Sequence, residues 1–277
     1  MNIHQFVKHA IEEDIQKGDH SALACIPENA TGSAELLVKE NGVLAGIEIA
    51  NEIFKEFDPN FRFNKKINDG EIVEKGDIAF NVTGNSIKLL SAERLVLNVM
   101  QRMSAIATLT AKYVQELEGL STKVLDTRKT TPLIRFLEKE AVRIGGGHNH
   151  RMGLYDMIML KDNHIDFAGG IAPAINQTKK YLLKNNLDLK IEIETRNLDE
   201  VNQVLIIGGV DRIMLDNFNY ENLRTAVSLI NNRYETEASG GINLNTARKY
   251  AECGVDYISV GALTHSVSNL DLSLKAL

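Results

Sequence analysis

The chain has 277 residues, 44% hydrophobic and 25% charged, with a formal net charge of −6. This composition is typical of a globular protein and excludes a disordered or low-complexity chain. The acidic balance argues against a general nucleic-acid or membrane-surface binder. No run reaches the roughly 18 apolar residues that span a bilayer. The two cysteines, Cys25 and Cys253, are far apart in the sequence, which argues against a disulfide framework and favours a reducing compartment. The charged N-terminal stretch gives no sign of a secretory signal.

The first part of the chain is predicted to mix helices with a small antiparallel sheet. Apolar residues at helical spacing predict helices over 3–17 and 47–57 and a long helix over 86–118. Residues 33–40 are predicted to form a strand that ends at an Asn-Gly turn. Further turn signals around 69–77 predict short strands there.

From residue 122 onward the pattern changes to alternating strands and helices. Segments with helical periodicity, such as 133–143 and 198–207, separate short apolar runs, which indicates βαβ units and a parallel sheet. There are six such runs, at 122–126, 156–160, 189–194, 212–216, 235–239 and 256–260. Because six is fewer than eight, we expect an α/β barrel that is incomplete or closed by another element.

Each apolar run is followed by polar, charged or glycine residues. Parallel strands place these ends on one face, where the active sites of α/β barrels are built. In chain order the residues are Thr127, Arg128 and Lys129, then Lys161, Glu194, Asp216, Ser239–Gly241 and Ser259–Gly261. This face is therefore the predicted catalytic face.

The segment 123–161 has eight basic and four acidic residues in an otherwise acidic chain, which predicts a site for a small anion. Arg128, Arg151 and Lys161 lie at strand ends or in a loop, and forked guanidinium groups suit carboxylates. His148 is predicted to be an uninvolved loop residue and His164 a structural one. A different set, Arg135, Glu138, Lys139 and Glu140, is predicted to form a solvated helix face.

Two acidic side chains and two glycine turns complete the predicted face. Glu194 and Asp216 are expected to hold Mg²⁺, directly or through water, or to bind sugar hydroxyls; a salt bridge with Lys161 or Arg128 is the alternative. The turns at 239–241 and 259–261 are expected to bind a phosphate through backbone N–H groups. A phosphorylated sugar diphosphate and an anionic acceptor fit this combination.

Several motifs resemble those of quinolinate phosphoribosyltransferase, also called nicotinate-nucleotide pyrophosphorylase (carboxylating). The most specific are DTRKTTP at 126–132 and KDNH at 161–164. The resemblance covers essentially the whole chain and extends to 39–46, 93–94, 138–139, 145–147, 150–151, 191–194, 215–217, 237–242 and 259–261. Two positions depart from the family pattern, since Leu133 and Ala105 stand where glycine is usual, and these put only local backbone geometry in doubt.

The resemblance implies a reaction and an architecture. Quinolinate and phosphoribosyl pyrophosphate would give nicotinate mononucleotide, pyrophosphate and CO₂ with Mg²⁺, in cytoplasmic NAD biosynthesis. The implied architecture is that of a type II phosphoribosyltransferase, with an N-terminal α/β sandwich over 1–104 and an incomplete α/β barrel over 105–277. A C-terminal helix would pack back on the first domain. A homodimer, alone or within a hexamer, would complete its sites across the interface.

The resemblance also implies residue roles. Arg94 would reach the partner's pocket, and Lys129 would lie near the pyrophosphate. The implied catalytic residues are Lys129, Lys161, Glu194 and Asp216. The implied quinolinate ligands are Arg128, His150, Arg151 and Lys161, and Thr127 is a further implied substrate-binding residue. The implied ligands of the 5-phosphate are Ser239, Gly240, Gly241, Ser259, Val260 and Gly261.

Three other interpretations fit the sequence less well. A paralogue with another acceptor, such as nicotinate, should lack part of the cation set, which is complete here. A non-catalytic phosphate-binding barrel would not need Glu194 together with Asp216. Residues 69–84 resemble a carrier-type hammerhead but lack a lysine at a defined hairpin tip.

Overall fold

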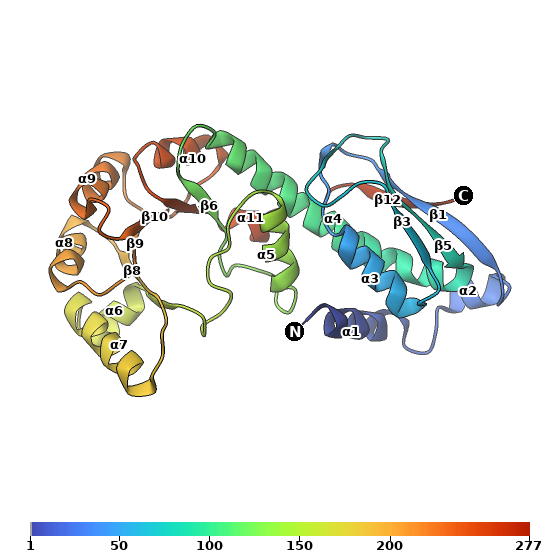
Figure 1. The fold of residues 1–277 in the computed structure, drawn as a ribbon, viewed down its shortest axis with the longest axis horizontal. Helices are drawn as coiled ribbons and strands as arrows, with labels where there is room; N and C mark the ends of the chain where they lie inside the picture. Colours follow the sequence, from blue (N-terminus) through green and yellow to red (C-terminus); the bar gives the residue numbers. More distant parts are fainter. Residues whose placement is uncertain (1) are drawn as a thin grey trace. The chain divides into compact units, whose positions relative to one another are not determined.

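The computed structural model in Figure 1 describes residues 2–277, which divide into two compact units. The first unit contains the described residues up to Ala111, together with Thr130–Gly146 and Leu263–Leu277. The second contains Lys112–Lys129 and Gly147–Ala262. The boundary expected between residues 104 and 105 lies inside helix α4 (Ser86–Glu116), which continues without a break from the first unit into the second.

The first unit is built on a four-stranded antiparallel sheet. Its strand order is β12-β1-β5-β3, with bounds Leu272–Ala276, Thr31–Val38, Ile78–Asn85 and Arg62–Lys65. Along β1 every second residue from Ala34 to Val38 is buried, as expected for a strand with one face on a core. A smaller pair joins β2 (Gly42–Val43) to β4 (Ile72–Val73). The expected antiparallel region is confirmed, although β3 was not predicted.

Helices cover this sheet, and the predicted helix over 47–57 matches α3 (Ile47–Phe57) in both bounds. Phe54 of α3 is fully buried and lies 6.0 Å from the ring of Phe80 on β5, which fixes the helix against the sheet. The remaining helices of the unit are α1 (Ile3–Ile15), α2 (His20–Cys25), most of α4, and α5 (Arg135–Ile144).

The expected C-terminal helix is wrong, because residues 272–276 form strand β12, which pairs antiparallel with β1. The segment does belong to the first unit, as expected. Leu270, Leu272 and Leu274 are buried and alternate with polar residues. This period of two is a strand pattern, and it was visible in the sequence.

The second unit contains a six-stranded parallel sheet whose strands match the six predicted runs. The order is β6-β11-β10-β9-β8-β7, so β6 and β7 are edges and the sheet is open. Its strands are β6 (Lys123–Leu125), β7 (Ile158–Leu160), β8 (Ile191–Thr195), β9 (Arg212–Asp216), β10 (Glu235–Ser239) and β11 (Tyr257–Ser259). An incomplete barrel is therefore the observed arrangement.

Helices pack on the apolar face of this sheet. Ile213, Leu215, Ala238 and Ile258 are fully buried, and Figure 1 shows α8, α9 and α10 along one side of the strands. The helices are α6 (Asp162–Ala168), α7 (Ile171–Asn185), α8 (Leu198–Ile207), α9 (Tyr220–Ile230) and α10 (Leu244–Ala251), and the short α11 (Ala262–His265) begins where the first unit resumes. The other face of the sheet is left for polar side chains.

Helix α5 does not present the solvated face expected from its charges, because Glu138 and Lys139 are buried. One carboxylate oxygen of Glu138 accepts hydrogen bonds from Arg102 Nη2 at 2.8 Å and from the Thr131 hydroxyl at 2.9 Å. The other accepts the backbone N–H of Thr131, also at 2.9 Å. Arg102 is 36 positions away in the sequence, so local charge periodicity gave no sign of this pair.

Removing the charge of Glu138 should therefore destabilise the protein. We expect Glu138→Gln to lower the free energy of unfolding by about 3 kcal/mol, because it leaves Arg102 partly buried without its counter-charge. Glu140→Gln is the matched control on the same helix, since Glu140 is exposed enough for its pair with Arg143 to contribute less than about 0.5 kcal/mol. Urea unfolding of both variants measures the difference, and equal losses would contradict the role given to Glu138.

Candidate active site

The polar face of the parallel sheet is organised in layers along the strands. Alternation places Glu192 and Glu194 of β8 on the same face, and the strand register aligns Ser239 with Asp216. The layer at the carboxyl ends of the strands contains Glu194, Asp216, Ser239 and Ser259. Four of the strand-end residues that the sequence predicted thus lie in one layer.

Asp216 is held by neutral hydrogen-bond donors. The hydroxyl of Ser239 donates to one carboxylate oxygen of Asp216 at 2.5 Å, and the side-chain amide of Asn217 donates to the other at 2.6 Å. Each carboxylate oxygen has a second lone pair, so these bonds orient Asp216 without using all of its acceptor capacity.

Lys161 and Glu194 face each other near the same edge. Lys161 Nζ lies 3.5 Å from the carboxylate of Glu194, so the ion pair considered as the alternative role of Glu194 is present. Burial raises the pKa of Glu194; the charge of Lys161 lowers it, and the charge of Asp216 raises it further. Lys161 precedes α6, and its backbone N–H donates to His164 Nδ1 at 2.9 Å. This contact confirms the structural role predicted for His164.

Two guanidinium groups lie in the same part of the second unit. Burial lowers the pKa of Arg151, and the neighbouring charge of Arg128 lowers it further. Arg151 donates to the carbonyl of Met157 at 3.2 Å, which orients its side chain. Lys129 is exposed, and its backbone N–H donates to the hydroxyl of Thr127 at 3.0 Å. Neighbouring like charges of this kind are stabilised by a bound anion.

The glycine turn after β10 makes a close backbone approach. Gly240 has φ +96°, and a Cβ there would lie 2.9 Å from the backbone nitrogen of Asn217, so only glycine fits. After β11, Val260 is buried and its N–H donates to the carbonyl of Leu125 at 2.9 Å. The Val260 N–H, predicted as a phosphate donor, is therefore already used within the sheet.

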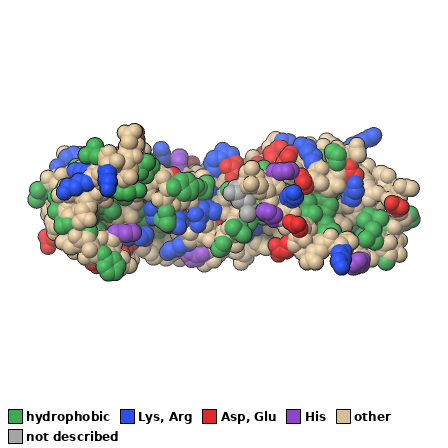
Figure 2. Space-filling view, turned by 90° about the horizontal axis from the view of Figure 1, so that it is seen from below, with side chains coloured by type: hydrophobic (Ala, Val, Ile, Leu, Met, Phe, Trp, Pro, Cys, Tyr) green, Lys and Arg blue, Asp and Glu red, His purple; other side chains and the backbone are tan. Residues whose placement is uncertain are grey.

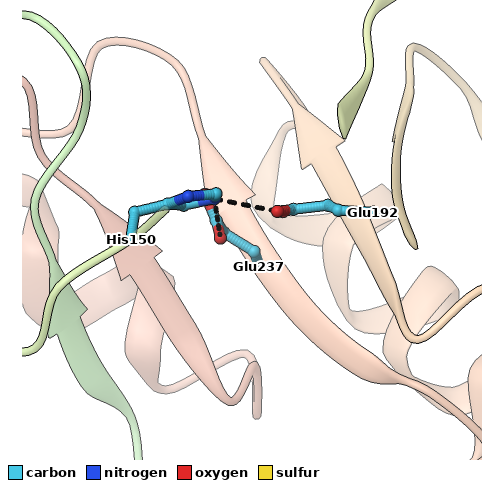
Figure 3. Close-up of side chains that lie close together, drawn as sticks. All are labelled: His150, Glu192 and Glu237. Atoms are coloured by element: carbon cyan, nitrogen blue, oxygen red, sulfur yellow. Dashed lines mark ion pairs between the residues drawn. The ribbon is translucent and has the colours of Figure 1, made fainter. Parts of the chain in front are cut away.

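A buried cluster beneath these residues was not predicted. Figure 3 shows the ring of His150 pointing between the carboxylates of Glu192 and Glu237, with Nε2 at 2.8 Å and 3.5 Å from them. Arg212 Nη1 lies 3.1 Å from Glu237. Glu192 alternates with Glu194 along β8, and this spacing of two was the one sequence signal that placed it on the same face.

Both ring nitrogens of His150 contact the protein. Nδ1 lies 2.6 Å from the backbone nitrogen of Arg151, and the side chain of His150 is only 4% exposed. Burial alone would lower the pKa of His150, but Glu192 and Glu237 outweigh it and raise the pKa to about 9. The resemblance implied that His150 binds quinolinate; in the structure its ring lies buried against two carboxylates.

Arg94 belongs to the first unit, whereas the other predicted site residues belong to the second. Arg94 is exposed on α4 and lines a pocket of about 520 Å³ within the first unit. Phe6, Asn98, Arg102 and Glu138 also line this pocket.

Comparison with known proteins identifies the family of the chain. The model of the quinolinate phosphoribosyl transferase N-terminal domain matches residues 19–104, and that of the C-terminal domain matches 106–275. The chain belongs to the quinolinate phosphoribosyltransferase family. The family predicted from the sequence is confirmed, and with it the two-part α/β architecture.

Relatives of this family are similar over nearly the whole chain. Quinolinate phosphoribosyltransferase [decarboxylating] 2b, mitochondrial, of Nicotiana tabacum is 45% identical, covering 99% of this chain and 82% of its own. The probable nicotinate-nucleotide pyrophosphorylase [carboxylating] of Bacillus subtilis is 40% identical, and the match covers 99% of this chain and 93% of that protein. The crystal structure of NadC from Streptococcus pyogenes superimposes with a TM-score of 0.93 at 39% sequence identity. The superposition covers 99% of this chain and 97% of the NadC chain.

On the face seen in Figure 2, Lys and Arg side chains are interspersed with Asp and Glu. Within residues 2–277, no helix combines the length and the apolar character needed to cross a bilayer.

The raised pKa of His150 predicts a pH-dependent stability. The folded state holds this proton more tightly than the unfolded state, so the stabilisation is complete below pH 6.5 and is lost as the pH rises through about 9. We expect the free energy of unfolding to fall by about 3 kcal/mol over this window. His150→Gln should flatten the profile and His148→Gln should not, as measured by denaturant unfolding between pH 6 and 10. A profile that stays equally steep in His150→Gln would contradict the assignment.

Proposed function

We propose that this chain transfers the phosphoribosyl group of phosphoribosyl pyrophosphate to quinolinate with loss of CO₂, giving nicotinate mononucleotide and pyrophosphate. The observation that carries the proposal is the grouping of three cations, Arg128, Arg151 and Lys161, in the unit whose strand ends hold Asp216 and Glu194. Membership of the family supports it. In this proposal the product enters NAD biosynthesis.

The cations provide the chemistry that a dicarboxylate needs. Quinolinate has two adjacent carboxylates, and forked guanidinium groups bind carboxylates through paired hydrogen bonds. Because Arg128 already lowers the pKa of Arg151, a bound dianion would relieve the repulsion between them. Lys161 exchanges its contact with Glu194 for a contact with substrate in this proposal. A pocket for nicotinate, with one carboxylate, would leave part of this charge unmatched.

Glu194 and Asp216 have the donor set for Mg²⁺. This ion prefers carboxylate oxygens and keeps several waters or phosphate oxygens as its other ligands. The charge of Asp216 raises the pKa of Glu194, which shows two anions close together at one edge of the sheet, where a divalent cation would stabilise both. When bound, Mg²⁺ would supply positive charge to the pyrophosphate.

The protein's own residues act on the reacting atoms as follows. The pyridine nitrogen forms a bond to C1 of the ribose while the bond from C1 to pyrophosphate breaks. Positive charge develops on the ribose, and the carboxylates of Glu194 and Asp216 stabilise it. Lys129, exposed at the end of β6, is assigned to the departing pyrophosphate. The 5-phosphate is assigned to the turns at 239–241 and 259–261, where Gly240 permits close approach.

Decarboxylation needs no nucleophilic side chain. Once the ring nitrogen carries four bonds, its positive charge stabilises the electron pair left at C2 when CO₂ departs. A proton then replaces the carboxylate at C2.

We also propose a homodimer in the cytoplasm. Arg94 would serve the site of a second copy, because it belongs to a different unit from the remaining cations. Assembly of dimers into hexamers is the alternative quaternary state, and sedimentation distinguishes the two. Both cysteines are free, which suits a reducing compartment. Plant relatives named mitochondrial or chloroplastic make fractionation the test of location.

Substitutions should separate the quinolinate site from the metal site. We expect Arg128→Ala and Lys161→Ala each to lower turnover at least a hundredfold, since a buried substrate carboxylate would lose roughly 2–5 kcal/mol of charged contact. Asp216→Asn should impair Mg²⁺-dependent use of phosphoribosyl pyrophosphate while leaving quinolinate binding nearly unchanged. Release of CO₂ and calorimetric titration of quinolinate measure the two effects. Loss of quinolinate affinity in Asp216→Asn, or near-normal turnover in Arg128→Ala, would refute these assignments.

Subunit mixing tests whether Arg94 acts in the partner's site. Arg94→Ala and Lys161→Ala, each nearly inactive alone, should complement each other after subunit exchange, because a mixed dimer has one site with both defects and one with neither. Random reassortment leaves about a quarter of all sites intact. Recovery near 25% of wild-type activity is expected. Absence of recovery, with exchange verified by mass spectrometry, would show that Arg94 does not act across the interface.

A further inference from the structure

The cluster beneath the site has acceptor capacity that its neighbours do not satisfy. Glu192 and Glu237 are both fully buried, and within residues 2–277 neither oxygen of Glu192 and only one of Glu237 has a hydrogen bond of good geometry. Burying a carboxylate in this way is costly unless a counter-charge reaches it. Beyond the close contact to His150, Glu192 has no other ion pair among the described residues. The contact with the His150 ring is therefore what makes the burial of these two carboxylates energetically acceptable.

A metal ion is one possible counter-charge, and the geometry disfavours it. Ligand atoms of His150, Glu192 and Glu237 lie within 4.8 Å of one another. However, the guanidinium of Arg212 donates to the same oxygen of Glu237 that faces His150, at 3.1 Å. A divalent ion there would lie close to a fixed positive charge. A proton on Nε2 of His150 balances the two carboxylates without this repulsion.

We propose that Glu192 and Glu237 are positioning residues for quinolinate recognition, acting through His150 on Arg151. The carboxylates keep Nε2 of His150 protonated and pointing inward. Nδ1 then lies against the main chain at Arg151, 2.6 Å from its backbone nitrogen. The backbone of His150 is fixed separately, since its own N–H donates to Asp126 at 2.8 Å. The ring thus sets the main-chain direction at Arg151, and with it the side chain assigned to substrate.

Glu192 also acts on Arg151 through its charge. The charge of Glu192 raises the pKa of Arg151, opposing the lowering by Arg128. The negative charge of Glu192 reduces the cost of placing the guanidinium groups of Arg128 and Arg151 close together. Because quinolinate is the substrate assigned to these groups, the effect should fall on quinolinate and not on phosphoribosyl pyrophosphate. This inference rests on the proposed function.

The test compares Glu192→Gln and Glu237→Gln with the control Glu235→Gln. Glu235 lies on the same strand as Glu237 and also binds Arg212, but it has no contact with His150. We expect each cluster variant to raise KM for quinolinate about tenfold and to change KM for phosphoribosyl pyrophosphate less than twofold. The control should change neither. Two cluster variants are used so that one that fails to fold leaves the other informative.

A spectroscopic readout tests the cluster without turnover. Ring ¹⁵N signals of His150 at neutral pH should show both nitrogens protonated in the wild type and in Glu235→Gln, and a mixture of neutral tautomers in both cluster variants. Unchanged ring signals, or equal rises in both KM values, would overturn the proposal. A stoichiometric metal ion in the purified wild type that is lost in Glu192→Gln would overturn it as well. If the wild type does not turn over quinolinate, the proposed function fails, while the ring signals still decide the role of the carboxylates.

Discussion

Two carboxylates, Glu192 and Glu237, are fully buried on the inner face of the parallel sheet, and such groups are tolerated only where counter-charges reach them. His150 and Arg212 provide those charges, at 2.8 Å and 3.1 Å. The inner face of the parallel sheet is therefore polar, whereas its opposite face, which packs against helices, is apolar. The strand-end layer above, with Glu194 and Asp216, is built on this interior. The candidate active site is thus the outermost of several polar layers.

Local pattern was sufficient to predict the elements of this fold. The six runs became the six parallel strands because each is short, apolar on one face and followed by polar residues. Helix α3 begins and ends where its periodicity begins and ends. The same alternation in residues 270–276 identifies β12, and it was overlooked in favour of a helix.

Contacts between distant residues were beyond the reach of local pattern. Glu138 looked like one member of a charged helix face, and its burial depends on Arg102, which lies on another helix. Glu237 stands in a glycine-turn motif, and its contact with His150 joins residues that no periodicity relates. Family motifs predicted Arg128, Lys161 and Asp216 as site residues but gave no sign of which residues hold them in place. The residues that support a site are therefore harder to predict than those at its surface.

The path of the chain has a consequence for modularity. The polypeptide leaves the second unit after Lys129 and returns at Gly147, so the segments that contain Arg128 and Arg151 flank an excursion into the first unit. A fragment beginning at residue 105 would contain Glu138 without Arg102 and β12 without β1. The two family domains, although contiguous in sequence, are thus not interchangeable parts. Recombination between relatives at this boundary would conserve function only where both parents share the contacts that cross it.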